Sequence, residues 1–181
     1  MERNTALELL NEYVKNQKMI AHCLASELVM RALATRLGEN PDIWGLAGLL
    51  HDIDVEITNA DHLTHAMEAV KILESVGVEP EIVEAIMLHN ENALHNTPRT
   101  KKLHHALAAG ETITGLIFAT AMVYPDKKIS SVKPKSITKR MKEKAFAASV
   151  KRENIMECEK IGLTIDEFAE LSLVALENMD I

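Results

Sequence analysis

Aromatic side chains are scarce in this chain of 181 residues, of which phenylalanine, tryptophan and tyrosine make up 3%. Alanine, leucine, isoleucine, valine and methionine carry the apolar content instead, and these residues favour helices packed on helices over a sandwich of sheets. The length suits one main domain with a tail. The composition therefore predicts an all-α protein and argues against a β-rich fold.

Long apolar runs and cysteine pairs are also lacking. No stretch reaches the roughly 18 to 20 residues that cross a bilayer, and the first residues lack signal-peptide character. We therefore expect a cytoplasmic protein with no membrane partner. The cysteines, Cys23 and Cys158, stand far apart in apolar or helical contexts, so we expect both to be reduced. Neither a disulfide framework nor a cysteine-rich zinc site is indicated.

Positive charge is concentrated in one segment of an acidic chain. The net charge is -7, yet residues 127–152 hold ten of the 20 lysines and arginines and one acidic residue, Glu143. Such a segment could attract phosphates, although a solvated helical face that balances an acidic body is the simpler interpretation. Nucleic-acid binding is not indicated, because the whole chain is acidic and the only aromatic residue of the segment is Phe146.

Helical periodicity covers most of the chain, with stop and start signals between the periodic segments. A glycine follows two of these segments, a proline begins others, and Thr164 to Glu167 reads as a capping box. The expected helices span residues 19–37, 41–52, 61–76, 80–90, 99–123, 134–142, 145–151 and 165–179. We predict a helical bundle over residues 1–125, followed by a small C-terminal helical lobe over residues 126–181 that contains the basic segment 127–152.

Histidines and acidic residues recur on the inward faces or at the ends of these helices. The candidates for metal ligands are His22, His51, Asp52, His65, His89 and Glu111. Taken singly, each has a simpler interpretation, because a lone histidine on an apolar face is more often a hydrogen-bonded core residue. Together they would leave several buried polar groups short of partners, which a metal centre would resolve. Imidazole and carboxylate ligands suit Fe, Mn, Co, Ni or Zn.

The order of these residues is similar to the H…HD…H…H…D pattern of the two-metal branch of the HD-domain phosphohydrolases, over about residues 15–125. The resemblance implies that His22 and His51 are terminal ligands and that Asp52 bridges two ions. It makes His65 and His89 the ligands of the second ion. It further implies metal-dependent hydrolysis of a small nucleotide or another phosphoester or phosphoanhydride, with one or two divalent ions per chain.

Two stretches of the sequence resemble particular subgroups of the HD superfamily. Residues 65–69 through 85–89 look like the helical dinucleoside-tetraphosphate hydrolases of this superfamily. Residues 110–117 and 146–152 look like a small set of uncharacterised bacterial HDIG-type proteins, for which the resemblance implies no substrate.

The chain departs from the pattern at two places. Glu111 stands where the final ligand is usually aspartate, and Ile53 and Asp54 replace the Ile-Gly of many members. Asp54 and Glu56 therefore add carboxylates just beyond Asp52, the central catalytic candidate. Either could act as a general acid or base, although acidic loop residues facing solvent are the simpler interpretation.

Cations for phosphate recognition are predicted at the start of the helix that contains Glu111. They are Arg99, Lys101 and Lys102, with the basic stretch 139–144 as the alternative and a surface role as the simpler interpretation for each. His104 and His105, about two turns before Glu111, are less favoured candidates for the same pocket. His62 lies one turn from His65 and competes with it as a ligand, and we prefer His65 because it begins the apolar periodicity.

Two other functions are compatible with the sequence. Some di-iron HD proteins are oxygenases with nearly the same ligands, and a degenerate HD module that binds metal or nucleotide for regulation is favoured by Glu111. No glycine-rich phosphate loop, Gly-x-Ser-x-Gly, His-Glu-x-x-His or Cys-x-x-Cys motif competes. The metal, the physiological substrate and the oligomeric state, for which a homodimer is one option, are left open.

Overall fold

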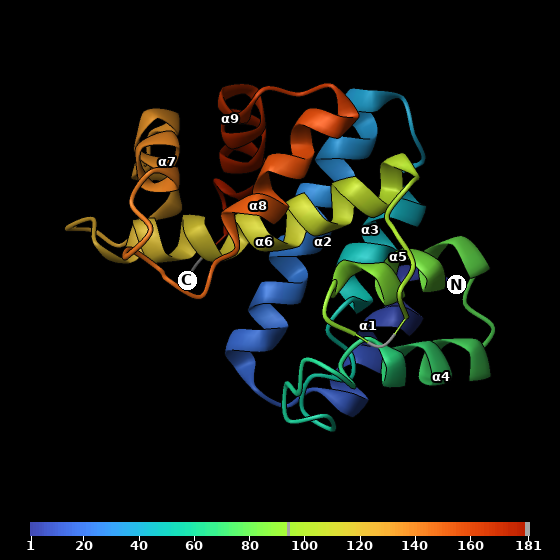
Figure 1. Ribbon diagram of the computed structural model, residues 1–181. Coiled ribbons are helices and arrows are strands. Elements are labelled where there is room, and N and C mark those ends of the chain that lie inside the picture. The colour runs from blue at the N-terminus through green and yellow to red at the C-terminus, as the bar shows by residue number, and fades with distance from the viewer. Residues whose placement is uncertain (94, 180–181) are drawn as a thin grey trace.

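The computed structural model describes residues 1–93 and 95–179, and every regular element among them is a helix (Figure 1). This confirms the predicted all-α fold. The α-helices are α1 (Arg3–Tyr13), α2 (Gln17–Leu37), α3 (Pro41–Leu50), α4 (Met67–Ser75), α5 (Pro80–His89), α6 (Lys102–Met122), α7 (Pro134–Met141), α8 (Arg152–Ile155) and α9 (Ile165–Leu176), and short 3-10 turns form η1 (Ile129–Ser131) and η2 (Met156–Ile161).

Local signals set several helix boundaries where the sequence predicts them. Gly38 ends α2 in the left-handed conformation, with a φ of 72°. The side chain of Asn40 accepts hydrogen bonds from two amides of the first turn of α3, in which Pro41 is the first residue. Thr164 and Glu167 form the predicted capping box at the start of α9.

The predicted helix over residues 61–76 is wrong at its start. Residues 51–66 form turns, and α4 begins only at Met67. The carboxylate of Asp54 accepts hydrogen bonds from the amides of Ala66 and Ala69 at 2.8 and 2.9 Å, so a residue distant in sequence caps this helix. Ala66 takes a left-handed φ of 76° next to this carboxylate. The start of α4 therefore depends on a tertiary contact rather than on a local signal.

The predicted helix over residues 145–151 is also wrong, because this segment forms turns. The guanidinium of Arg152 donates hydrogen bonds to the carbonyls of Phe146, Ala147 and Val150. These bonds draw the three carbonyls toward one side chain, so they do not lie parallel along a helix axis. The segment is thus a loop wrapped around an arginine.

Helix α2 packs against both α3 and α6 (Figure 1). A carbon added at Gly48 of α3 would lie 2.6 Å from the carbonyl oxygen of Ser26, so the backbones of α2 and α3 are in direct contact. A carbon added at Gly110 of α6 would lie 2.9 Å from Sδ of Met30. These close approaches bring the helices that carry or precede His22, His51 and Glu111 together.

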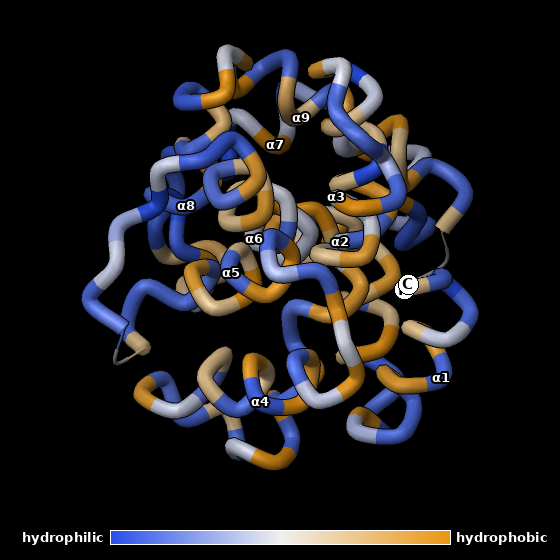
Figure 2. The backbone as a smooth tube through the Cα atoms, turned by 90° about the vertical axis from the view of Figure 1, so that its right-hand side faces the viewer, coloured by the Kyte–Doolittle hydropathy of each residue, from blue (hydrophilic) through white to orange (hydrophobic). Residues whose placement is uncertain are grey.

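The C-terminal helices share the core of the bundle. Buried Phe168 and Leu173 of α9 belong to the same apolar cluster as Leu33 of α2, and α8 packs against α6. Figure 2 shows hydrophobic stretches of α2, α3, α5 and α6 in the middle of the molecule. The division between residues 125 and 126 stays a prediction. Within the described part of the chain, none of the helices has the length and apolarity to cross a membrane.

Replacing Gly48 with alanine is expected to lower the free energy of unfolding by about 1–3 kcal/mol. The added carbon would overlap the backbone of α2, and this cost outweighs the roughly 1 kcal/mol that alanine gains over glycine in a helix. Gly110→Ala is the matched comparison, because the flexible Met30 side chain can move away. Urea unfolding followed by circular dichroism should show the larger loss for Gly48→Ala, and the reverse order would contradict this packing.

Candidate metal centre

Four imidazoles converge on the carboxylate of Asp52. Nε2 of His22 and of His51 lie 3.6 and 3.5 Å from Oδ2 of Asp52. Nε2 of His65 and of His89 lie 3.1 and 3.6 Å from Oδ1. Each carboxylate oxygen therefore faces its own pair of histidines, and the two groups of potential ligands have Asp52 in common.

Helix ends and turns deliver most of these side chains. His22 projects from the second turn of α2, whereas His51 and Asp52 directly follow α3. His65 lies two residues before α4, and His89 is the last residue of α5. All five are buried or nearly so. The centre thus joins four consecutive helices in chain order.

Hydrogen bonds on the outer ring nitrogens fix how the imidazoles point. Nδ1 of His51 and of His89 each donates to the backbone carbonyl three residues earlier, at 2.8 and 2.5 Å. Nδ1 of His65 donates to Oδ1 of Asp54 at 2.7 Å. With Nδ1 engaged in this way, Nε2 is the nitrogen directed at Asp52.

His22 is oriented by a hydroxyl instead of a carbonyl. The Thr114 hydroxyl lies 2.9 Å from Nδ1 of His22 and donates its own proton to the carbonyl oxygen of Glu111 at 2.6 Å. The hydroxyl oxygen must therefore accept a hydrogen bond from Nδ1 of His22. The Nδ1 atom of each of the four rings is thus engaged, and all four Nε2 atoms face Asp52.

The His22 and His51 pair fits a metal ion. Burial lowers the pKa of His22, and it lowers the pKa of His51 to about 3, so both rings are neutral near pH 7. Their Nε2 atoms lie 3.1 Å apart, and each ring holds its single proton on Nδ1. Two lone pairs therefore face each other with no hydrogen between them. Two imidazole nitrogens bound at about 2.1 Å to one ion lie about 3 Å apart when the angle at the ion is near 90°.

The second pair has the same spacing and a different charge. Nε2 of His65 lies 3.1 Å from Nε2 of His89. Burial alone would lower the pKa of His65, but hydrogen bonds to Asp52 and Asp54 outweigh it and raise this pKa to about 10. Burial likewise opposes the ionisation of Asp52, yet the surrounding imidazoles hold the pKa of this carboxyl well below its usual range. An ion bound on this side must displace the proton on Nε2 of His65.

Glu111 reaches the edge of the centre from α6. Its Oε2 lies 3.9 Å from Nε2 of His22, and its Oε1 accepts a hydrogen bond from the hydroxyl of Thr112. Burial raises the pKa of Glu111 to about 8. The structure therefore brings Glu111 to the His22 side, and its role as a ligand stays a prediction.

Asp54 and Glu56 take positions that the sequence does not predict. Asp54 is fully buried, so the interpretation of a solvent-facing carboxylate is wrong, and its two oxygens are occupied by His65 and by the amides at the start of α4. Glu56 accepts hydrogen bonds from the amides of Lys15 and Asn16 at 2.8 and 2.7 Å. Neither side chain lines the cavity beside Asp52. Asp54 orients the ring of His65, and the predicted acid or base role of Asp54 and Glu56 gains no support.

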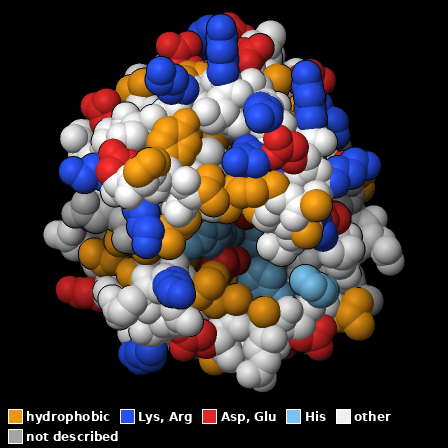
Figure 3. Space-filling view, turned by 90° about the vertical axis from the view of Figure 1, so that its left-hand side faces the viewer, with side chains coloured by type: hydrophobic (Ala, Val, Ile, Leu, Met, Phe, Trp, Pro, Cys, Tyr) orange, Lys and Arg blue, Asp and Glu red, His pale blue; other side chains and the backbone are white. Residues whose placement is uncertain are grey.

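A cavity of about 280 Å³ opens over Asp52 and three of the histidines, His22, His65 and His89. Figure 3 shows this hollow, with pale blue histidines around a carboxylate and with lysine or arginine side chains near the rim. The side chains and backbone that line it come from His22, Asp52, His65, His89, Asn90, Glu91, Glu111, Thr112, Gly115, Ser149, Val150, Lys151 and Asn154. The bundle supplies the floor, and residues near the start of α8 supply a wall.

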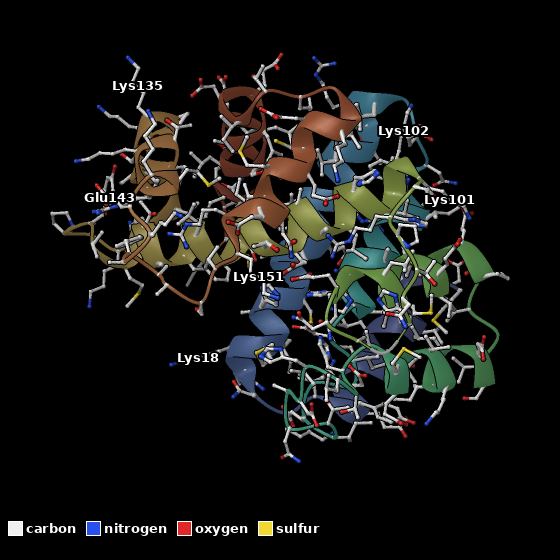
Figure 4. The ribbon with its side chains drawn as sticks, in the orientation of Figure 1. Lys18, Lys101, Lys102, Lys135, Glu143 and Lys151 are labelled. Carbon is white, nitrogen blue, oxygen red and sulfur yellow. The ribbon has the colours of Figure 1, made fainter. Side chains whose placement is uncertain are left out.

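The predicted phosphate-binding cations lie outside this cavity. Arg99 donates to the last two carbonyls of α5 at 2.8 and 2.6 Å, so its buried guanidinium caps that helix. Lys101 and Lys102 each pair with a surface glutamate, and Figure 4 shows them near the start of α6, well apart from Lys151. The lysine that lines the cavity is Lys151. In the sequence, Lys151 belongs to the basic segment 127–152 and to the stretch 146–152, but neither marks it as a cation of the cavity.

The remaining histidine candidates also lie elsewhere. His62 is exposed and does not line the cavity, whereas His65 does. Nδ1 of His104 accepts from the amides that precede α6, and His105 bonds Glu157 at 2.5 Å. The preference for His65 over His62 thus agrees with the geometry.

Comparison with known proteins gives the family. The family model described as HD domain matches residues 19–121, which include all six predicted ligands. The chain belongs to the HD domain family. Its HD domain runs from the first turn of α2 to the last turn of α6, so α7, α8 and α9 lie beyond the match.

Several curated relatives carry the name Ribonuclease Y. The protein from Geobacter metallireducens is 32% identical over 82 residues, which are 45% of this chain and 16% of the relative. The protein from Rubrobacter xylanophilus is 26% identical over 148 residues, which are 82% of this chain and 28% of the relative. This HD protein therefore spans less than a third of the length of these relatives. No solved structure gives a significant match.

Removing the hydrogen bond to Nδ1 of one histidine should weaken the binding of the ion on that side only. Asp54→Asn is expected to lower metal affinity about 10- to 100-fold on the His65 side, and Thr114→Val should do so on the His22 side. Thr120→Val is the control, because the Thr120 hydroxyl bonds only a carbonyl of its own helix. Calorimetric titration with Mn²⁺ would measure this, and equal weakening by all three variants would contradict the assignment.

Metal binding on the His65 side should depend on pH. With a pKa of about 10, His65 is protonated at pH 7, so an ion on its side competes with one proton and should bind about tenfold more tightly per pH unit between pH 6 and 8. His51, with a pKa of about 3, is already neutral over this range, so on the other side only Glu111, whose pKa burial raises to about 8, would release a proton on binding the ion. In Glu111→Gln protein the His22 side should therefore bind its ion with little dependence on pH. Proton release measured in two buffers of different ionisation enthalpy tests this, and equal release for both ions in the Glu111→Gln protein would contradict it.

Proposed function

We propose that this HD protein is a metal-dependent phosphohydrolase that acts on a small nucleotide or another small phosphoester or phosphoanhydride. The observation that carries the proposal is the sharing of Asp52 between two pairs of histidines, with two oxygens facing opposite ways. A carboxylate in this position suits a pair of neighbouring divalent ions better than a single ion. Membership of the HD family supports the same chemistry.

Divalent ions at such a centre supply a Lewis acid for phosphate oxygens and lower the pKa of a bound water towards neutrality. The residues of the chain keep the potential ligands charged or oriented for binding. Asp52 stays ionised because the imidazoles around it stabilise its charge. Asp54 and Thr114 hold two of the rings in place through Nδ1. Little rearrangement of the ligands is needed, which is how a fixed site lowers a reaction barrier.

The cavity favours a small substrate. Its volume of about 280 Å³ suits a phosphate group with a small attached moiety, and histidines are the only aromatic rings among the described residues that line it. The relatives named Ribonuclease Y support phosphodiester hydrolysis as the competing reaction. An RNA oligonucleotide therefore belongs in any substrate panel.

The test measures both the metal content of the protein and its turnover of phosphorylated substrates. Protein loaded with Mn, Fe, Co, Ni or Zn would be assayed on p-nitrophenyl phosphate, nucleotides, dinucleoside polyphosphates and RNA. We expect two ions per chain and hydrolysis of a small phosphoester. Asp52→Ala should lose both ions and at least 10³-fold in rate, and His51→Ala should lose one ion, because only Asp52 serves both sides. His62→Ala is the control and should match the unchanged protein.

Other outcomes would replace the proposal. Bound metal and nucleotide without turnover of any substrate would indicate a regulatory module. Turnover that requires ferrous iron and dioxygen would indicate an oxygenase. Metal content unchanged in both Asp52→Ala and His51→Ala would show that the ions bind elsewhere.

A further inference from the structure

We propose that Lys151 binds the phosphate group of the substrate, and that Glu91 holds this lysine at the cavity until a phosphate replaces it. The inference rests on the proposed phosphohydrolase function and names a recognition residue for it. It concerns a residue beyond the region that the HD family model matches, which ends at residue 121.

Lys151 is the only lysine or arginine among the described residues that line the cavity. It lies directly before α8, and in Figure 4 it is labelled beside α6, in the middle of the molecule. Its side chain is 43% exposed, and its Nζ pairs with Oε1 of Glu91. A partly exposed lysine on a long flexible stem can change partners at small cost.

Glu91 stays satisfied when Lys151 leaves it. Its other oxygen, Oε2, lies 3.1 Å from the guanidinium of Arg99 and 3.3 Å from the side-chain amide of Asn154. Arg99 is in turn fixed on the carbonyls at the end of α5. Movement of Lys151 therefore leaves no buried charge without a partner, and the exchange avoids the main cost of breaking an ion pair.

Most other polar side chains on the walls are already engaged. The amide of Asn90 donates to two backbone carbonyls, the Asn154 side chain bonds Glu91 and Arg99, and the Thr112 hydroxyl bonds Glu111. Ser149, two residues before Lys151, is exposed and lines the cavity. A phosphate above the histidines would thus meet Lys151 as its cation and the Ser149 hydroxyl as a second donor.

The backbone that carries Lys151 is held in place. Arg152 donates to the carbonyls of Val150, Ala147 and Phe146, which ties the loop to the start of α8. A carbon added at Gly115 of α6 would lie 3.4 Å from Cγ2 of Val150, so this loop packs against the bundle. Only the lysine side chain needs to move when a phosphate enters, which limits the entropy lost on binding.

The first test is binding of inorganic phosphate to Mn-loaded protein, measured by calorimetry. Lys151→Ala should weaken binding about 10- to 100-fold, because it removes a charge-assisted hydrogen bond. Lys102→Ala is the matched control, since Lys102 is also exposed and paired with one glutamate but lies outside the cavity. With a phosphoester substrate, Lys151→Ala should raise KM by a similar factor, and Lys151→Arg should restore most of the loss.

The second test uses a variant that is expected to strengthen phosphate binding. Glu91→Gln frees Lys151 and should strengthen phosphate binding several-fold, and this gain should vanish in the Lys151→Ala background. A gain that persists without Lys151 would be a general effect of charge and would overturn the exchange. Equal phosphate affinity in the Lys151→Ala and Lys102→Ala proteins would overturn the recognition role.

These outcomes separate the inference from the proposed function. If unchanged protein hydrolyses a phosphoester and Lys151→Ala binds phosphate as tightly as Lys102→Ala, the inference alone fails. If unchanged protein loaded with Mn neither binds phosphate nor hydrolyses any phosphoester, the proposed function fails and the inference fails with it.

Discussion

One buried carboxylate constrains this structure more than any other group. Asp52 stays ionised among four imidazoles, and its two oxygens face opposite pairs of them. A charge in this position requires partners on every side, so the helices around it must end or turn where their histidines can reach it. Helix α3 stops just before His51, and α5 stops at His89. The close contact of α2 with α3 at Gly48 serves the same arrangement.

Hydrogen bonds to the outer nitrogens of the four histidines hold their rings in fixed orientations. Backbone carbonyls orient two rings, and the side chains of Asp54 and Thr114 orient the other two, so all four Nε2 atoms point inward. Asp54 also caps α4, which links the position of His65 to the start of that helix. The loop before α8 and α8 itself add a wall and a cation, Lys151, to the cavity. The orienting residues Asp54 and Thr114 are therefore interleaved with or close to the candidate ligands in the sequence, whereas this wall comes from a later part of the chain.

The sequence predicted what depends on local signals. Periodicity, the Asn40 cap and the Thr164 capping box gave most of the helices, and the order of histidines gave the residues that the structure brings together. Contacts between residues far apart in the chain could not be predicted from the sequence. Asp54 caps α4 from 12 and 15 residues away, and Lys151 meets Glu91 across 60 residues. Neither pairing leaves a periodic trace, so Asp54 was expected in solvent and Lys151 was not singled out.

Anomalous diffraction from a crystal grown with Mn²⁺ would test the role of Asp52 most directly. We expect two peaks about 3.5–4 Å apart, one beside His22 and His51 and the other beside His65 and His89, with an oxygen of Asp52 bound to each. A single peak, or two peaks that do not share Asp52, would contradict the two-sided centre on which the proposed function rests.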